Sequence, residues 1–233
     1  MLQIWDRYPR LFGAIQRAHE ERKIQQGHNF EHAFAVAQRA REFCECPFWI
    51  DNAWLAGTSH NADRMLQGDL GIDRRGDVPA EKIERLVRSW LDLESRINED
   101  DKAWVVRAVL DHGKPNDDDD SAVTVALKDA DRVVNARIDI VLRSAQWQHD
   151  LPLIDPVLLL DDKRGRYNGR LTVVADLFDC LDWGSENPRL CVRTPKARKM
   201  IKSRVDDLRR FLEMLVEQRR EEGLVPWPLQ TPV

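Results

Sequence analysis

A chain of 233 residues with 42% hydrophobic and 33% charged residues is long enough to bury one large core, and this composition excludes a disordered polypeptide. A formal net charge of -4 argues against nucleic acid as the partner, because binding to the phosphate backbone needs a surplus of Lys and Arg. The first ten residues lack the apolar core of a signal peptide, and no later window is apolar enough to span a bilayer. Four cysteines are too few for a disulfide scaffold. We therefore expect one soluble cytoplasmic domain without a membrane partner.

Two helices are predicted before residue 47. The first ends at Gly27 and carries an apolar stripe of Leu11, Phe12, Ile15 and Ala18. Asn29 is the predicted N-cap of the second, which Pro47 closes. His32 lies in its first turn, where the positive end of the helix dipole favours the neutral imidazole that a metal ion needs. His28 lies just outside this helix and could line the same opening.

A third helix is predicted from about Asp51 to Gln67, and its apolar run 53–57 indicates that it is packed deep in the core. Its polar end consists of His60, Asn61, Asp63 and Arg64. Buried imidazole, amide and carboxylate groups need partners or a metal ion, so this end is the centre of the candidate site. A single histidine at this place could also be satisfied by a backbone carbonyl.

A fourth helix is predicted from Pro79, and its apolar pattern indicates a structural role. Asn98 is the predicted N-cap of a fifth helix with an acidic first turn. Gly113 stops the fifth helix just after His112. The acidic run 117–120 is interpreted as a solvated loop and helix start rather than as a metal site.

A sixth helix has a predicted buried stripe from Val123 to Ile138, and Asp131 shares a face with Asn135. An aspartate on a core-facing helix is costly to bury without a cation. A seventh helix follows at 171–181, and a last long helix begins at Thr194. Without strand alternation the fold class is all-α, a bundle of about eight helices forming one domain over 1–233, in which 153–233 is a helical extension that packs on the core 1–150.

Metal-type ligands thus recur on separate apolar helices, in the order His32, His60 with Asn61, His112 and Asp131. Three blocks carry this order: His28-Asn-Phe-Glu-His32, Leu55-Ala-Gly-Thr-Ser-His60-Asn61, and Lys128-Asp-Ala-Asp131-Arg-Val-Val-Asn135. Together with the tail after Thr194, they resemble the HD-domain superfamily of metal-dependent phosphohydrolases, as found in small bacterial predicted HD hydrolases. The third block is also similar to the hydrolase half of the enzymes that break down ppGpp. This similarity implies that the last metal ligand is Asp131 rather than Asp129.

The resemblance implies an HD-domain-like helical bundle with a divalent metal ion held by His32, His60, Asn61 and Asp131. Imidazole and carboxylate ligands suit Mn, Fe, Co, Ni or Zn. It further implies a hydrolase of small phosphorylated molecules, such as a nucleotide, phosphomonoester or pyrophosphate, in which a metal-activated water attacks phosphorus. Asn61 departs from the family, whose defining residue here is Asp, and a neutral amide brings no negative charge to the ion.

The other polar residues near these blocks receive candidate roles. The candidate catalytic residues are Asp131, which would orient the water, Asp63, which is offset by one position from a catalytic glutamate of several family members, and His112. His112 is a general acid, a second-metal ligand or only a helix-end histidine. The candidate substrate-binding residues are Arg64, Arg132, Lys128 and His28. For Lys128, as for Lys114, a salt bridge is the competing interpretation.

Two alternatives remain open at this point. Asn61 suggests a degenerate HD module that binds a nucleotide or protein partner without turnover. Some HD-fold proteins resemble di-iron oxygenases, which would need more His and Asp ligands than this sequence offers. Trp227 between two prolines could dock a second copy of the chain, so a homodimer is considered, or could fold back on its own subunit.

Overall fold

The computed structural model describes residues 3–22, 28–73, 76–153 and 172–223, and these residues form helices without a β-strand. The predicted all-α class is confirmed. The α-helices are α1 (Ile4–Arg7), α2 (Pro9–Arg22), α3 (Phe30–Phe43), α4 (Ile50–Ser59), α5 (Ala62–Leu70), α6 (Ala80–Leu91), α7 (Glu99–Asp111), α8 (Ala122–Asn135), α9 (Ile140–Trp147), α10 (Val173–Asp179) and α11 (Pro195–Glu221). Two 3₁₀ helices are η1 (Pro47–Trp49) and η2 (Cys180–Gly184). Gly27 and Trp227, for which a helix end and a docking role are predicted, lie outside the described residues.

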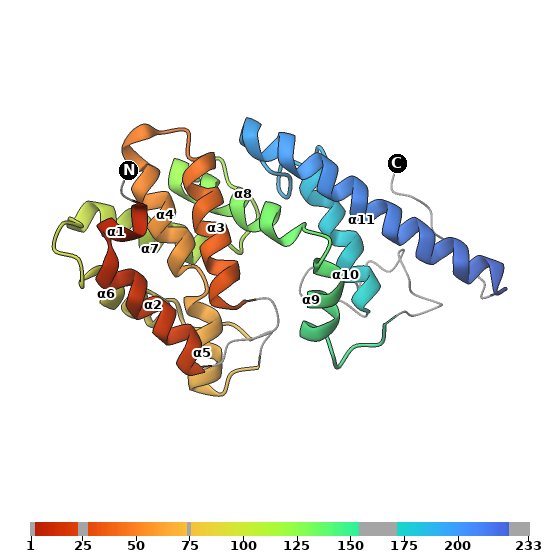
Figure 1. Cartoon of the computed structure of the whole chain (residues 1–233), viewed down its shortest axis with the longest axis horizontal. Helices are drawn as coiled ribbons and strands as arrows, with labels where there is room; N and C mark the ends of the chain where they lie inside the picture. The colour runs from red at the N-terminus through yellow and green to blue at the C-terminus, as the bar shows by residue number, and fades with distance from the viewer. Residues whose placement is uncertain (1–2, 23–27, 74–75, 154–171, 224–233) are drawn as a thin grey trace.

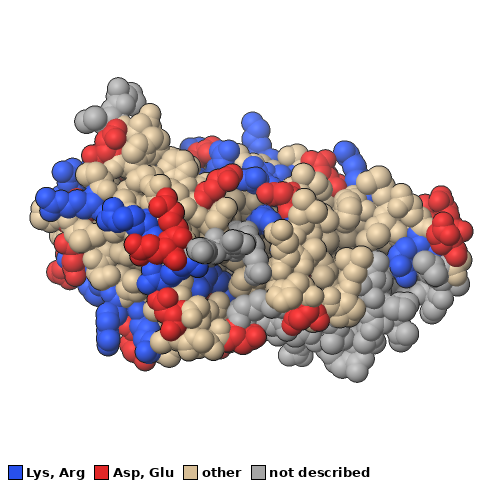
Figure 2. Space-filling model, turned by 60° about the horizontal axis from the view of Figure 1, so that its bottom comes forward, with Lys and Arg blue, Asp and Glu red and all other residues tan. Residues whose placement is uncertain are grey.

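The helices form two groups along the long axis of the molecule. In Figure 1, α1–α7 lie together at one end, α8 runs from this group toward the other end, and α9–α11 form the second group. No described helix is long and apolar enough to cross a membrane. The face drawn in Figure 2 carries Lys and Arg interspersed with Asp and Glu, and neither sign dominates it.

Side-chain caps fix where the site-bearing helices begin. The Asn29 side chain accepts a hydrogen bond from the His32 backbone N–H at 3.0 Å, and the Asn98 side chain accepts one from Asp101 N–H at 2.8 Å. Both predicted N-caps are confirmed. Ser121 caps α8 in the same way through Thr124 N–H at 3.1 Å. A cap satisfies one of the unpaired N–H groups of a first turn, so it sets the register of the side chains that follow.

The predicted third helix is wrong as one element, because the chain turns between α4 and α5. Every residue from Asn52 to Ser59 is buried, whereas α5 has one buried and one exposed side. His60 and Asn61 therefore lie at the junction between the two helices.

The crossing of α3 and α4 is unusually close because it involves small residues. A Cβ atom on Gly57 would lie 2.5 Å from the Ala37 Cα, so only glycine permits this separation. On another side of α4, the fully buried Trp54 stacks on the rings of Tyr8 and Phe12. The close crossing brings the first turn of α3 and the end of α4 to the same side of the core.

The long helix α11 packs against both groups. Its first half contributes Ala197, Ile201 and Val205 to the main core, and its second half forms a smaller cluster with α9 and α10 through Leu208 and Leu212. Ile138, predicted to be buried, is 55% exposed because α8 ends at Asn135.

Buried polar contacts hold the start of α11 on α8. Asp129 is fully buried and accepts hydrogen bonds from the backbone N–H groups of Arg193 and Thr194 at 2.7–3.0 Å. Asp120 pairs with Lys128 at 2.7 Å and with Arg193 at 2.6 Å, and its side chain is only 5% exposed. The interpretation of 117–120 as a solvated loop is therefore wrong at Asp120, which is the acidic partner in a buried ion pair.

Candidate metal centre

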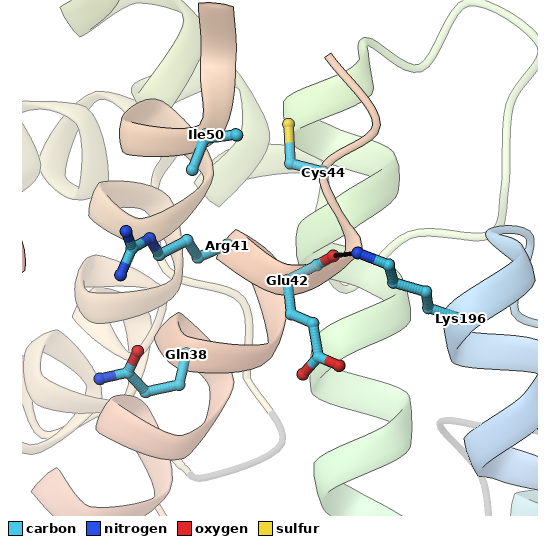
Figure 3. Close-up of a pocket in the computed structure, with 6 residues that line it drawn as sticks. All are labelled: Gln38, Arg41, Glu42, Cys44, Ile50 and Lys196. Carbon is cyan, nitrogen blue, oxygen red and sulfur yellow. Dashed lines mark hydrogen bonds between the residues drawn. The ribbon is translucent and has the colours of Figure 1, made fainter. Parts of the chain in front are cut away.

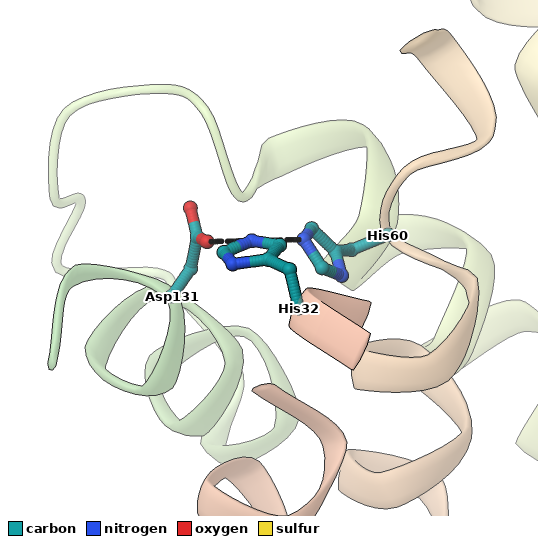
Figure 4. A group of neighbouring side chains, drawn as sticks. All are labelled: His32, His60 and Asp131. Carbon is teal, nitrogen blue, oxygen red and sulfur yellow. Dashed lines mark hydrogen bonds and ion pairs between the residues drawn. The ribbon is translucent and has the colours of Figure 1, made fainter. Parts of the chain in front are cut away.

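Three ligand atoms converge from three separate parts of the chain. The Nε2 atoms of His32 and His60 are 3.3 Å apart, and the Asp131 Oδ1 atom lies 3.3 Å from the first and 3.7 Å from the second. Figure 4 shows His32 between the other two side chains, each entering from a different helical segment. His32 comes from the first turn of α3, His60 follows α4, and Asp131 comes from the middle of α8.

The orientation of the His60 ring is fixed by a backbone carbonyl. Its Nδ1 atom lies 2.7 Å from the Gly57 oxygen, which has no hydrogen to give, so Nδ1 carries the proton and donates it. The lone pair is then on Nε2, the nitrogen that faces the cluster. A partner of this kind on the second ring nitrogen is the usual arrangement of a metal-binding histidine.

The electrostatics favour the ionisation states that a metal ion needs. Burial lowers the pKa of His60 to about 3, so this imidazole is neutral at physiological pH. Burial alone would raise the pKa of Asp131, but the hydrogen bond from His32 and the positive charges that His60 and His32 can carry lower it well below its usual value. The neutral His60 and the ionised Asp131 are already in the states that a cation needs, whereas the proton that His32 donates to Asp131 would be released on metal binding.

The spacing of the three donor atoms also fits an ion. Ligand atoms about 2.1 Å from zinc in a tetrahedral site are separated from one another by roughly 3.4 Å. The separations of 3.3, 3.3 and 3.7 Å are close to this value. Imidazole nitrogen and carboxylate oxygen together are the donor set of Mn, Fe, Co, Ni and Zn sites. The chain therefore fits the predicted class of cofactor in donor chemistry and in spacing.

Asn61 makes a contact that a carboxylate could not make. Its side chain is buried, and Nδ2 donates a hydrogen bond to the His28 carbonyl at 3.0 Å. The amide thus joins the segment before α3 to the junction of α4 and α5. Its role as a metal ligand stays a prediction, whereas its role as a donor is evident in the structure.

Two further histidines border the cluster. The His112 ring lies 5.4 Å from the His60 ring, centroid to centroid, and its Nδ1 atom is 2.6 Å from the Val109 carbonyl oxygen. The His28 ring lies 5.7 Å from the His32 ring. Burial lowers the pKa of His28 well below its usual value, and the positive charge of Arg64 adds to the effect. The structure brings both histidines to the site, and their chemical roles remain predictions.

Arg64 lies at the edge of the site, next to the indole of Trp147. Its Cζ atom is 5.1 Å from the Trp147 ring centroid, and Trp147 in turn packs edge-on against His28 at 4.9 Å. Asp63 is held by its neighbour: it accepts the Arg64 backbone N–H at 2.7 Å and lies 3.5 Å from Arg64 Nε. Asp63 is not among the converging ligand atoms, and its predicted catalytic role has no contact with the cluster to support it.

The prediction that Lys128 and Arg132 bind substrate is wrong, because both side chains are occupied by structural partners. The Lys128 side chain is 1% exposed and its Nζ atom binds Asp120 and the Pro115 carbonyl. Arg132 is buried and donates to the Asn116 side chain at 2.7 Å and to the Cys191 carbonyl at 3.1 Å. Both cations stabilise the attachment of the chain before α11. Releasing either one to bind a phosphate would leave buried partners unpaired.

Lys114, by contrast, forms the predicted salt bridge, at 2.6 Å from Asp111, with its side chain 65% exposed.

Known proteins provide no further guide to this site. Comparison of the chain with protein-family models, with curated proteins and with solved structures gives no match. Its chemistry therefore has to be inferred from its own residues.

Three side chains, Asn135, Arg143 and Trp147, extend the site beyond the predicted ligands. Asn135 donates Nδ2–H to Asp131 Oδ1 at 2.8 Å, as their shared helix face suggests. Arg143 and Trp147 of α9 reach the site from the second group of helices. The sequence contains no signal for these two, because nothing in it shows that α9 folds back over the start of α3.

A separate pocket of about 370 Å³ lies at the opposite end of α3. Figure 3 shows its lining residues, Gln38, Arg41, Glu42, Cys44, Ile50 and Lys196. Lys196 Nζ donates to the Glu42 carbonyl at 3.0 Å across the rim. None of the candidate site residues lines this pocket, which is distinct from the candidate metal centre.

Proposed function

We propose that the chain is a metal-dependent hydrolase of small phosphorylated molecules and belongs to the HD-domain superfamily. The observation that supports it is the convergence of His32, His60 and Asp131, the ligands that the sequence resemblance implies, within 4.8 Å of one another. When bound, a divalent ion of this class supplies a Lewis acid and an activated water for attack on phosphorus.

The two oxygens of Asp131 have different surroundings. Oδ1 is directed to the histidines and to Asn135, whereas Oδ2 has no hydrogen-bond partner among the described residues. The side chain is 23% exposed, so Oδ2 is accessible to water. Oδ1 would hold the metal ion, and Oδ2 would be the oxygen that can accept a hydrogen bond from water.

Groups at the edge of the cluster would bind the phosphate and protonate the leaving group. Arg64 is a cation at the edge; its guanidinium contacts Asp63 at 3.5 Å and Gln67 at 3.2 Å, and a phosphate would compete with these partners for it. His112 donates its Nδ1 proton to the Val109 carbonyl, which leaves Nε2 as the nitrogen that can exchange a proton with substrate. His28 borders the same edge.

The test is a screen of phosphomonoesters, nucleotides and ppGpp-like compounds against protein loaded with Mn, Co or Ni. We expect phosphate or pyrophosphate release that the Asp131→Asn variant loses, because the amide cannot replace the charged ligand. Asp69→Asn is the matched control, since Asp69 pairs with Arg22 on the surface of α5. Activity of Asp131→Asn equal to wild type would assign the turnover to a contaminant and remove support for the site.

The donor role of Asn61 favours a second candidate function, a degenerate HD module that binds a phosphorylated ligand without turnover. In that case a nucleotide raises the melting temperature of the protein, while no tested compound is hydrolysed with any metal. The same panel of compounds and metals distinguishes the two functions.

A further inference from the structure

We propose that Arg143 of α9 is a positioning residue for the candidate metal centre. Acting through Asn135, it holds Asp131 so that one carboxylate oxygen faces the two histidines and the other faces water. The inference rests on the proposed metal site, and it adds a dependence of that site on a helix outside the main core.

A continuous chain of hydrogen bonds links the three residues. Arg143 Nη1 donates to Asn135 Oδ1 at 2.9 Å, and Asn135 Nδ2 donates to Asp131 Oδ1 at 2.8 Å. The same Asp131 oxygen lies 3.3 Å from His32 Nε2. The guanidinium thus reaches the ligand cluster through a single intervening side chain.

The direction of this chain follows from the chemistry of an amide. The Asn135 side chain has one accepting end and one donating end, and rotation by 180° exchanges them. Arg143 has only donors, so it requires the oxygen end and turns the NH₂ group toward Asp131. The Asp131 carboxylate has only acceptors and requires the NH₂ end, so both neighbours of the amide favour the same orientation. Arg143 therefore stabilises the orientation and the position of the amide that fixes Asp131 Oδ1.

The contact is well suited to arginine and poorly suited to lysine. Arg143 Nη2 also donates to the Asn135 backbone carbonyl at 3.1 Å, one of the carbonyls left unpaired at the end of α8. A planar guanidinium can bind the side chain and the main chain of one residue together, whereas a lysine offers a single charged nitrogen. The side chain is 17% exposed, and Asp139 lies 3.6 Å from its Nε atom.

Cobalt binding tests the proposal by affinity and by the visible absorption spectrum, which responds to the position of the ligands. We expect Arg143→Gln to bind Co²⁺ about 10-fold more weakly than wild type, the lower end of the range for partners of metal ligands. Its spectrum should change as well. The matched control is Arg137→Gln, because Arg137 also pairs with Asp139, at 3.0 Å, and does not bind Asn135. We expect the control to retain wild-type affinity and spectrum.

A second variant separates positioning from folding. Asn135→Leu removes the amide but keeps the backbone carbonyl that Arg143 binds, so the link between α8 and α9 is retained. We expect the same loss of affinity and the same spectral change as in Arg143→Gln. Wild-type cobalt affinity and spectrum in Asn135→Leu, or in folded Arg143→Gln, would overturn the positioning role and leave the metal site standing. Failure of the wild-type protein to bind cobalt would overturn both proposals.

Discussion

The buried amide of Asn61 makes the stability of the metal-free protein sensitive to a very small change. In Asn61→Asp, a carboxylate replaces the donor to the His28 carbonyl, and two acceptors then face each other. We expect the free energy of unfolding of the metal-free variant to fall by about 1–3 kcal/mol, the cost of an unsatisfied buried group. Addition of Co²⁺ should restore part of this loss, because a dication compensates the new charge. Thermal and urea unfolding with and without metal measure both effects.

Asn52 provides the matched control for this substitution. It is also buried and also donates through Nδ2, to Asp101 Oδ1 at 2.7 Å, but at the first turn of α7, whereas His112 and the cluster lie at the other end of that helix. Asn52→Asp should lose stability to the same extent with and without cobalt. Equal recovery of the two variants on metal addition would show that Asn61 is not part of the metal environment.

The neutral state of His60 predicts how stability depends on pH. Burial lowers its pKa to about 3, so between about pH 6.5 and 3 the unfolded chain binds a proton that the folded chain does not. Metal-free protein should therefore lose stability as the pH falls below about 6.5, by up to about 1.4 kcal/mol per pH unit for this proton. His28, whose pKa is also lowered, acts in the same direction. Urea unfolding from pH 8 to 5 should show a smaller slope in His60→Gln and an unchanged slope in His149→Gln, where the side chain is exposed.

At the scale of elements, the close crossing of α3 and α4 depends on Gly57, which has no side chain. Gly57→Ala would place its Cβ 2.5 Å from the Ala37 backbone, so the helices must separate. We expect a loss of about 1–3 kcal/mol, as for other overpacked cores, together with weaker metal binding because His32 and His60 move apart.

Gly68→Ala is the control for this prediction, since a Cβ there meets nothing within 4 Å inside α5. It should stabilise the protein by about 0.5–1 kcal/mol. Wild-type stability and metal affinity in Gly57→Ala would mean that α3 and α4 can rearrange without affecting the cluster.

Elements with a local chemical signal could be predicted from the sequence. The N-caps at Asn29 and Asn98 lie where the pattern places them, since a cap depends on residues within one turn. The break after Ser59 could not be predicted, because no glycine or proline follows it before Gly68. The exposure of Ile138 has a similar origin, because the sequence pattern continues beyond the end of α8.

At the scale of the whole molecule, Lys128 connects the main core to the start of α11. Lys128→Met leaves Asp120 without one of its two cations, so we expect a loss of about 3 kcal/mol, typical of a broken buried ion pair. Cobalt affinity should be unchanged, because the lysine does not contact the cluster. Lys114 is exposed and its partner Asp111 keeps a second cation, Arg107, so Lys114→Met should cost no more than about 1 kcal/mol. Weaker cobalt binding by Lys128→Met would contradict this prediction and indicate that Lys128 contributes to the site.

The candidate ligands could be found from the sequence, whereas their surroundings could not. The sequence singles out His32, His60 and Asp131 because polar residues are unusual on apolar helices. Their order along the chain is the order of the ligands in the family that the sequence resembles. Arg143 and Trp147 belong to a helix that contacts the site only after the chain has folded back. Lys128 resembles a substrate-binding cation in sequence, and only its distant partners show that it is structural. Long-range contacts thus decide which polar residues act in chemistry and which hold the fold.

The separation of the three ligands along the chain has a consequence during protein synthesis. His32 and His60 emerge from the ribosome early, but 71 further residues, the last of them Asp131, must be added to complete the ligand set (131 minus 60). At about 5–20 residues per second, this takes roughly 4–14 s. Throughout that interval the nascent chain carries the two histidines of the proposed site without its carboxylate. If the proposed site binds a metal ion, its ligand set is therefore complete only late in biosynthesis, and a chain truncated before α8 would carry both histidines without the site.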